Sequence, residues 1–416
     1  MEFGVFSEVG TLRKVLVCRS GLAQARLTPA NCRELLFDDV LWVAQAKTDH
    51  YGFVNAMQDR GIEVFDTNDL LADILRTHEA RNWILDRKLS PGTVDQELAS
   101  QLRPWLDEMK PEELATRLIG GIVRGELPFV PAGLVSSCIG PCGFLLAPLP
   151  NALFTRDNCC WINDGVVLGS MYWPARRQET LLTAAIYQFH HRFNTQTRIW
   201  WGDPDVDHGG ATLEGGDVMP LSRDVVVVGM GERTSPQAVT QLARSLFARE
   251  AATHVIAARL PPSRGAMHLD TVFTFCDRDL VTIFPKIVNG ICCTSLRPGE
   301  TRRARRACRI GALSGSCGTF DRPEKAMRYR NGWRRVGSRA RAMGRRQQRH
   351  RAGAGRRCCL QPQRLHQYAL AQGWRGSHHN SERRAGTRAR GRPLHDLPAR
   401  ARRYLARTRS QRHHAI

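Results

Sequence analysis

The stretch DVVVVGMGERTSPQAVTQLARSLFAREAATHVIA, residues 224–257, indicates the fold class of this 416-residue chain. Residues 224–230 form a Val-rich run that begins at an aspartate, which is typical of a buried strand. Residues 238–250 then place apolar side chains at helical spacing, and residues 253–257 return to a short strand pattern. Because strand and helix patterns alternate, the sequence predicts an α/β protein.

The same alternation continues on both sides of this stretch. Further strands are predicted at Leu12–Cys18, Ile62–Asp66, Cys159–Gly169 and Leu280–Phe284, and a further helix at Arg177–Phe193. Residues 69–123 differ, since they carry only helical periodicity, with Pro111 suited to the first turn of a helix. We therefore predict an α/β domain built from residues 1–68 and 124–300, interrupted by an all-helical insertion at 69–123.

The composition changes sharply near residue 300. Residues 301–416 hold 32 of the 61 Lys and Arg residues, 31 of them Arg, but only 4 of the 39 Asp and Glu residues. The formal charge of +22 therefore belongs to this Arg-rich tail. The tail has few Val or Ile residues and no apolar periodicity, so it could not bury a core and is predicted to be disordered. A basic tail of this kind could bind nucleic acid through counterion release.

Nothing in the sequence predicts export or a membrane. The start, Met1-Glu2-Phe3, has no basic segment, and no apolar run reaches the roughly 18–20 residues that span a bilayer. The 13 cysteines follow no regular framework, and Cys138 and Cys142 lack a second ligand pair at zinc-site spacing. We expect a cytoplasmic protein with reduced thiols, no membrane partner and no metal.

Three short motifs place acids and a histidine where turns or strand ends would expose them. They are NALFTRD at 151–157, LEGGD at 213–217 and MHLDT at 267–271. The two glycines of the second motif allow a sharp turn between its carboxylates. On a strand, His268 and Asp270 would face the same side. Loops predicted at 173–177 and 231–233 add Arg176 and Arg233.

These residue types suit a small zwitterion with a cationic end. Two or more carboxylates hold a planar guanidinium by accepting its N–H groups in pairs, and an arginine would take the carboxylate of the ligand. A histidine beside an aspartate is a standard acid/base arrangement. Plainer interpretations stay open: Arg156-Asp157 as a surface pair, Glu-Gly-Gly-Asp as a turn, and His268 with Asp270 as a structural pair or two metal ligands.

Taken together, the motifs resemble those of arginine deiminase, in the guanidine-modifying pentein superfamily. The resemblance covers about the first 300 residues. Its motifs are GVFSEVG at 4–10, NCRELLFDD at 31–39, FTRD at 154–157, MYWPARR at 171–177, LEGGD at 213–217, HLDT at 268–271 and SLRP at 295–298. It implies a five-bladed α/β propeller with a helical insertion. It also implies hydrolysis of L-arginine to L-citrulline and ammonia with no cofactor, L-arginine and water being the small-molecule partners.

The resemblance assigns roles to eight residues. Asp157 and Asp270 would grip the substrate guanidinium, with Glu214 helping to orient it. His268 would protonate the leaving ammonia and then activate water. The substrate-binding positions would be Asn151, Phe154, Arg176 and Arg233, the two arginines holding the α-carboxylate. An amidinotransferase or a dimethylarginine hydrolase is the alternative within the superfamily, and assembly into a homo-oligomer is left open.

The family also uses a cysteine nucleophile, in a Gly-rich segment that ends His-Cys-Met-Thr-Cys-Pro, and this chain has no such segment. When one nucleotide is dropped, the codons of residues 385–398 can spell a Gly-rich segment with that ending. In the same frame, the windows 313–326, 342–349 and 365–379 can spell ordinary protein sequence in the order of the family. We interpret the tail as the last blade or blades translated out of frame, from a slip near residues 298–313. The chain as written is predicted to be inactive, and nucleic acid is not expected as a partner.

Overall fold

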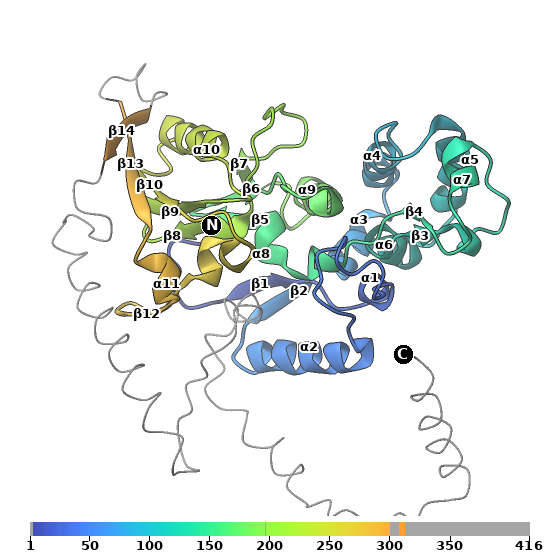
Figure 1. Ribbon diagram of the computed structural model, residues 1–416, viewed down its shortest axis with the longest axis horizontal. Helices are drawn as coiled ribbons and strands as arrows, with labels where there is room; N and C mark the ends of the chain where they lie inside the picture. Colours follow the sequence, from blue (N-terminus) through green and yellow to red (C-terminus); the bar gives the residue numbers. More distant parts are fainter. Residues whose placement is uncertain (1–2, 196, 300–307, 313–416) are drawn as a thin grey trace, which may run out of the picture. The chain divides into compact units, whose positions relative to one another are not determined.

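The computed structural model of the chain describes residues 3–195 and 197–299 and the backbone of residues 308–312 (Figure 1). Our prediction of a disordered tail at 301–416 falls outside these ranges, except for the short piece 308–312. There the chain forms strand β14 (Cys308–Ala312), which pairs antiparallel with β13 (Cys292–Pro298). This short piece therefore differs from the disorder that we predicted for the tail.

A five-stranded sheet contains the stretch that indicated the fold class. Its strand order is β14, β13, β10 (His254–Arg259), β9 (Val225–Met230) and β8 (Val218–Pro220). Strands β9 and β10 are parallel, and helix α10 (Pro236–Ala248) connects them. Apolar side chains of α10 share a core with those of the two strands, because both patterns put Val and Leu on the facing surfaces. The strand, helix and strand predicted over 224–257 are confirmed.

The predicted strand Cys159–Gly169 is wrong, because the chain reverses in its middle. It forms two antiparallel strands, β5 (Cys159–Ile162) and β6 (Gly165–Leu168), and β6 pairs with β7 (Arg198–Trp201). The reversal places Asn163 at a φ of 51°, a left-handed conformation that Asn tolerates. Helix α9 (Arg177–Phe189) then covers this region and ends four residues before the predicted end.

The remaining strands form three two-stranded sheets. They are β1 (Lys14–Val17) with β2 (Glu63–Asp66), β3 (Ile122–Val123) with β4 (Phe144–Leu146), and β11 (Phe273–Asp277) with β12 (Leu280–Ile283). Helix α2 (Val43–Gln58), which we did not predict, lies between β1 and β2 in the sequence. Short helices are α1 (Leu22–Ala25), α7 (Leu134–Cys138), α8 (Thr155–Asn158) and α11 (Pro285–Val288).

Four helices fill most of the segment predicted to be all-helical. They are α3 (Thr67–Ile74), α4 (His78–Lys88), α5 (Gln96–Asp107) and α6 (Pro111–Gly120), and α6 begins at Pro111 as predicted. The side chains of Asp66, Thr77 and Asp95 accept backbone N–H groups at the starts of the first three. Leucines of these helices share one apolar core with α9. The domain boundaries themselves stay a prediction.

The prediction of a mixed α/β fold is confirmed. No closed propeller is detected among the described residues, whose strands lie in five separate sheets. The five-bladed arrangement is therefore still a prediction. Across the described ranges, no helix combines the length and the apolar character needed to cross a bilayer.

Candidate functional site

Three of the predicted catalytic side chains lie together in the protein interior. One polar atom from each of Asp157, Glu214 and His268 lies within 4.8 Å of the other two. Each residue is at most 1% exposed. Asp157 belongs to α8, Glu214 precedes a 3-10 turn at Gly215–Asp217, and His268 precedes another at Leu269–Thr271. Motifs that are spread over residues 151–271 therefore form one acid/base cluster.

The turn after His268 is held by a carboxylate. Asp217 Oδ1 accepts the Leu269 N–H at 2.8 Å, and Asp217 Oδ2 accepts the Thr234 hydroxyl at 2.5 Å. Because these contacts fix a 3-10 turn, our prediction that His268 and Asp270 share one face of a strand is wrong. A Cβ on Gly216 would lie 2.8 Å from Nδ1 of His268, so the imidazole can pack there only against a glycine.

The His268 and Glu214 side chains form a buried ion pair. Nε2 of His268 lies 2.6 Å from Oε2 of Glu214, and its Nδ1 lies 3.6 Å from Oδ1 of Asp157. Burial opposes the charge on His268, but the charge of Asp157 and the hydrogen bond with Glu214 raise its pKa to about 9. Burial also opposes the charge on Glu214, but His268 and two arginines lower its pKa to about 2. At neutral pH the imidazole is protonated and the carboxylate is ionised.

The two arginines predicted to bind substrate contact this cluster directly. Nη1 of Arg233 lies 3.1 Å from Oε2 of Glu214. Nη1 of Arg176 lies 2.7 Å from Oδ2 of Asp157 and 3.8 Å from Oε2 of Glu214. Both guanidinium groups are buried, and both compensate buried carboxylates.

Glu179 is a member of the site that we did not predict from the sequence. It is 2% exposed and makes a two-point contact with Arg176, with Nε to Oε1 at 3.1 Å and Nη2 to Oε2 at 2.9 Å. Burial raises the pKa of Glu179 to about 7, although Arg176 opposes this. The available signal was its position three residues after Arg176 at the start of a helix, a spacing at which side chains are neighbours.

The other predicted site residues lie around the cluster. Nδ2 of Asn151 donates to the Leu35 carbonyl at 2.8 Å, so this side-chain amide links two distant segments of the backbone. Phe154 is half-buried, and its carbonyl accepts the Asp157 N–H at 3.0 Å. Asp270 is 8% exposed and lies in the 3-10 turn after His268, and it is not one of the compact group of three.

The cluster has the residue types of a metal site, but its charges do not fit one. Oε2 of Glu214 is within 3.1 Å of nitrogens of both His268 and Arg233. Nη1 of Arg176 lies 2.7 Å from Oδ2 of Asp157. A divalent cation would have to compete with two permanent positive charges for the same oxygens. The carboxylate oxygens instead accept hydrogen bonds from planar cations such as guanidinium and imidazolium.

The buried cysteines near the cluster are not activated. Burial raises the pKa of Cys160 to about 12 and that of Cys159 to about 11. A protonated thiol is a poor nucleophile, so neither suits covalent catalysis. Cys317, Cys358 and Cys359 of the tail lie outside the described residues.

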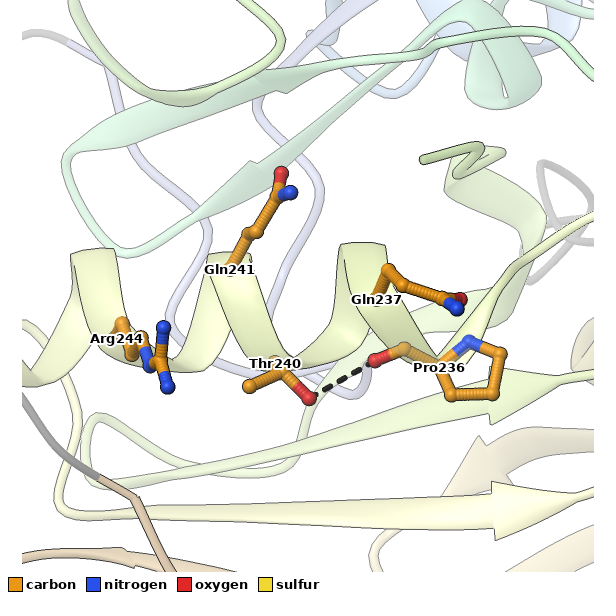
Figure 2. Close-up of a pocket in the computed structure, with 5 residues that line it drawn as sticks. All are labelled: Pro236, Gln237, Thr240, Gln241 and Arg244. Atoms are coloured by element: carbon orange, nitrogen blue, oxygen red, sulfur yellow. Dashed lines mark hydrogen bonds between the residues drawn. The ribbon is translucent and has the colours of Figure 1, made fainter. Parts of the chain in front are cut away.

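A shallow depression on helix α10 is unrelated to this chemistry. Figure 2 shows the residues that line it, which are Pro236, Gln237, Thr240, Gln241 and Arg244. The Thr240 hydroxyl donates to the Pro236 carbonyl at 2.9 Å, within the same helix. None of the five side chains is an acid, a histidine or a thiol, so this surface offers no acid/base pair.

Comparisons with known proteins give a family match and several weakly similar solved structures. Similar solved structures include a DDAH from Pseudomonas aeruginosa complexed with citrulline, at 11% identity over 66% of this chain and 70% of that chain, with a TM-score of 0.36. They also include SxtG, an amidinotransferase from Microseira wollei, at 12% identity over 68% and 71%, with a TM-score of 0.38. These scores are too low to support an argument. A family model described as arginine deiminase matches residues 33–311, which is more than half of the sequence, and the chain therefore belongs to the arginine deiminase family.

Proposed function

We propose that the buried cluster of Asp157, Glu214 and His268 serves the hydrolysis of L-arginine to L-citrulline and ammonia. One observation carries the proposal. A guanidinium group, that of Arg176, already lies against Asp157 at 2.7 Å, and the adjoining His268 and Glu214 form an ion pair at 2.6 Å. The cluster thus has both a carboxylate that accepts a planar guanidinium and a protonated group beside it.

The proposed chemistry proceeds in two halves. A cysteine thiolate attacks the guanidinium carbon, and ammonia leaves with a proton from His268, so that a cysteine-linked amidino group forms. His268 then takes a proton from water, which attacks the same carbon. The C–S bond breaks, which releases citrulline and restores the thiolate. The raised pKa of His268, about 9, supports its role as the acid of the first half.

The carboxylates would compensate the charge of the substrate guanidinium and orient the reacting groups. Asp157 and Asp270 would hold the two sides of the substrate guanidinium, and Glu214 would keep the His268 imidazole in position through the 2.6 Å contact. Asn151, Phe154, Arg176 and Arg233 would complete the substrate pocket. In this structure Nη1 of Arg233 lies 3.1 Å from Oε2 of Glu214.

The nucleophile is the missing part of this proposal. We propose that its codon is present but out of frame in the region of residues 301–416, together with the codons for the end of a five-bladed propeller. The chain as written should then be inactive, and the enzyme read in one frame should act in the cytoplasm.

The test is citrulline formation from L-arginine by two proteins. We expect no turnover by the 416-residue protein, and citrulline and ammonia in equal amounts from a protein restored to one frame. Asp157→Asn or His268→Gln in the restored protein should abolish turnover, whereas Asp224→Asn, at an exposed position, should not. Turnover by the chain as written would contradict the missing nucleophile. A folded restored protein that acts on dimethylarginine or transfers the amidino group, but makes no citrulline from arginine, would overturn the reaction proposed.

A further inference from the structure

Arg176 lies at the centre of the site. The family resemblance instead predicts that it binds the α-carboxylate, at the other end of the ligand from the guanidinium. Its side chain is 2% exposed, and every edge of its guanidinium faces an oxygen acceptor. Nε and Nη2 contact Glu179 at 3.1 and 2.9 Å, Nη1 contacts Asp157 at 2.7 Å, and Nη2 donates to the Asn151 carbonyl at 3.3 Å. The cation is therefore fully coordinated by the protein itself.

The contact with Asp157 uses the acceptor that the proposed function gives to the substrate. Nη1 of Arg176 also lies 3.8 Å from Oε2 of Glu214, the atom that accepts from His268. A second guanidinium that made a two-point contact with Asp157 would need Oδ2, which Nη1 of Arg176 already holds at 2.7 Å, and the like charges of the two guanidinium groups would repel in a buried site. An incoming guanidinium would have to displace the Nη1 end of Arg176.

We propose that Arg176 is an internal ligand of the guanidinium subsite, which an incoming guanidinium compound must displace before it binds. This inference rests on the proposed function, because it takes Asp157 as the acceptor of the substrate cation. The two contacts with Glu179 are on the opposite edge from Nη1. Arg176 can therefore leave Asp157 while Glu179 still holds it, and Glu179 is assigned as the positioning residue for this exchange.

The burial of the site agrees with a closed, self-occupied state. Asp157 and Glu214 are at most 1% exposed, and Glu179 is 2% exposed. Removal of the Arg176 charge would leave these carboxylates short of compensation, and buried uncompensated charge is strongly unfavourable. A small guanidinium compound would then be favoured over a rounder ammonium ion, because paired N–H groups match paired carboxylate oxygens.

The experiment compares ligands that lack a carboxylate. Methylguanidine binding to the 416-residue protein and to its Arg176→Met variant is measured by calorimetry, below denaturing concentrations, with methylammonium as the cation control. A protein whose binding-competent state is only a tenth populated binds about tenfold more weakly than its intrinsic affinity. We therefore expect Arg176→Met to bind methylguanidine at least about tenfold more tightly than the unchanged protein. Arg177→Met is the matched control, since Arg177 is the exposed neighbour, and it should not change the affinity.

A second variant identifies the acceptor. Adding Asp157→Asn to Arg176→Met should remove the gain, because the contested carboxylate is then absent. If Arg176→Met does not fold alone, methylguanidine should restore its circular dichroism spectrum and methylammonium should not. Unchanged or weaker methylguanidine binding by a folded Arg176→Met would overturn the inference, as would a variant that stays unfolded with both cations.

The two proposals fail in different ways. If methylguanidine binding does not improve but the restored protein makes citrulline, the self-occupied subsite is wrong and the proposed reaction stands. If the affinity rises as expected but the restored protein makes no citrulline, the subsite binds guanidinium and the reaction is wrong.

Discussion

Replacement of Glu214 by Gln is the most direct test of how the site is held together. The Glu214 carboxylate is fully buried and contacts His268 at 2.6 Å and Arg233 at 3.1 Å through Oε2. Its Oε1 accepts the Tyr172 N–H at 3.2 Å. The Gln side chain keeps the shape of the residue and an acceptor oxygen, but it removes the negative charge that compensates two cations.

The expected loss of stability follows from this geometry. Removal of one partner from a buried ion pair typically costs about 3–5 kcal/mol, because the other charge remains buried without compensation. For a folded unit of roughly 300 residues, an unfolding entropy near 0.6 kcal/mol/K converts this loss to a melting temperature lower by about 5–8 °C. The pKa of His268, which is about 9 with Glu214 present, should fall markedly, because burial would then be opposed mainly by Asp157.

Two measurements on the 416-residue protein check these values. Thermal unfolding followed by circular dichroism gives the melting temperature near pH 7, and titration of histidine ring resonances by NMR gives the pKa. Glu34→Gln, at an exposed glutamate, is the control and should leave both values unchanged. A melting temperature within about 2 °C of the unchanged protein, together with a His268 pKa still near 9, would refute the argument that Glu214 holds the imidazolium.

Three further predictions concern neighbouring features. Gly216→Ala should destabilise the protein by about 1–3 kcal/mol and shift the His268 ring resonances, because a Cβ there lies 2.8 Å from the ring; unchanged resonances would contradict this packing. The folded-state pKa of His268, about 9, lies above its ordinary 6.5, so its contribution of about 3 kcal/mol is complete below pH 6.5 and is lost as the pH rises through 9. Urea unfolding at several pH values should show this loss, and His268→Gln should flatten the curve above pH 6.5. Leu98→Ala, at a fully buried position of α5, should cost about 2–5 kcal/mol in urea unfolding, and a smaller change would mean that the helical core is loosely packed.

The sequence predicted well the helices and strands that bury one side against the core. The Val-rich strand and amphipathic helix of 224–257 bury side chains against each other, so their periodicity carries the signal. The same holds for the leucines of α5 and α6. Helix α2 was missed for the converse reason. Met57 is its one buried residue, so its apolar spacing is weak.

Features set by distant contacts could not be predicted locally. The reversal at Asn163 is held by its side-chain amide, which donates to the carbonyls of Arg223 and Ala251 at 2.9 and 2.6 Å. The turn after His268 depends in the same way on Asp217, some fifty residues earlier. The sequence motifs predicted most residues of the site because their residue types are chemically distinctive. They could not show that Arg176 would lie on Asp157, because that contact exists only in the folded chain.

The extent of the family match and the pairing of β14 with β13 together narrow the position of the proposed frame slip. The match continues to residue 311, and residues 308–312 pair in register with β13, from Pro298 opposite Cys308 to Thr294 opposite Ala312. The out-of-frame windows that we reconstructed begin at residue 313. If the reading frame slips, these observations favour the end of the interval 298–313 over its beginning. Resequencing of codons 295–315 should then find one missing or added nucleotide close to codons 311–313, and an unbroken frame there would remove the basis for placing the nucleophile in the tail.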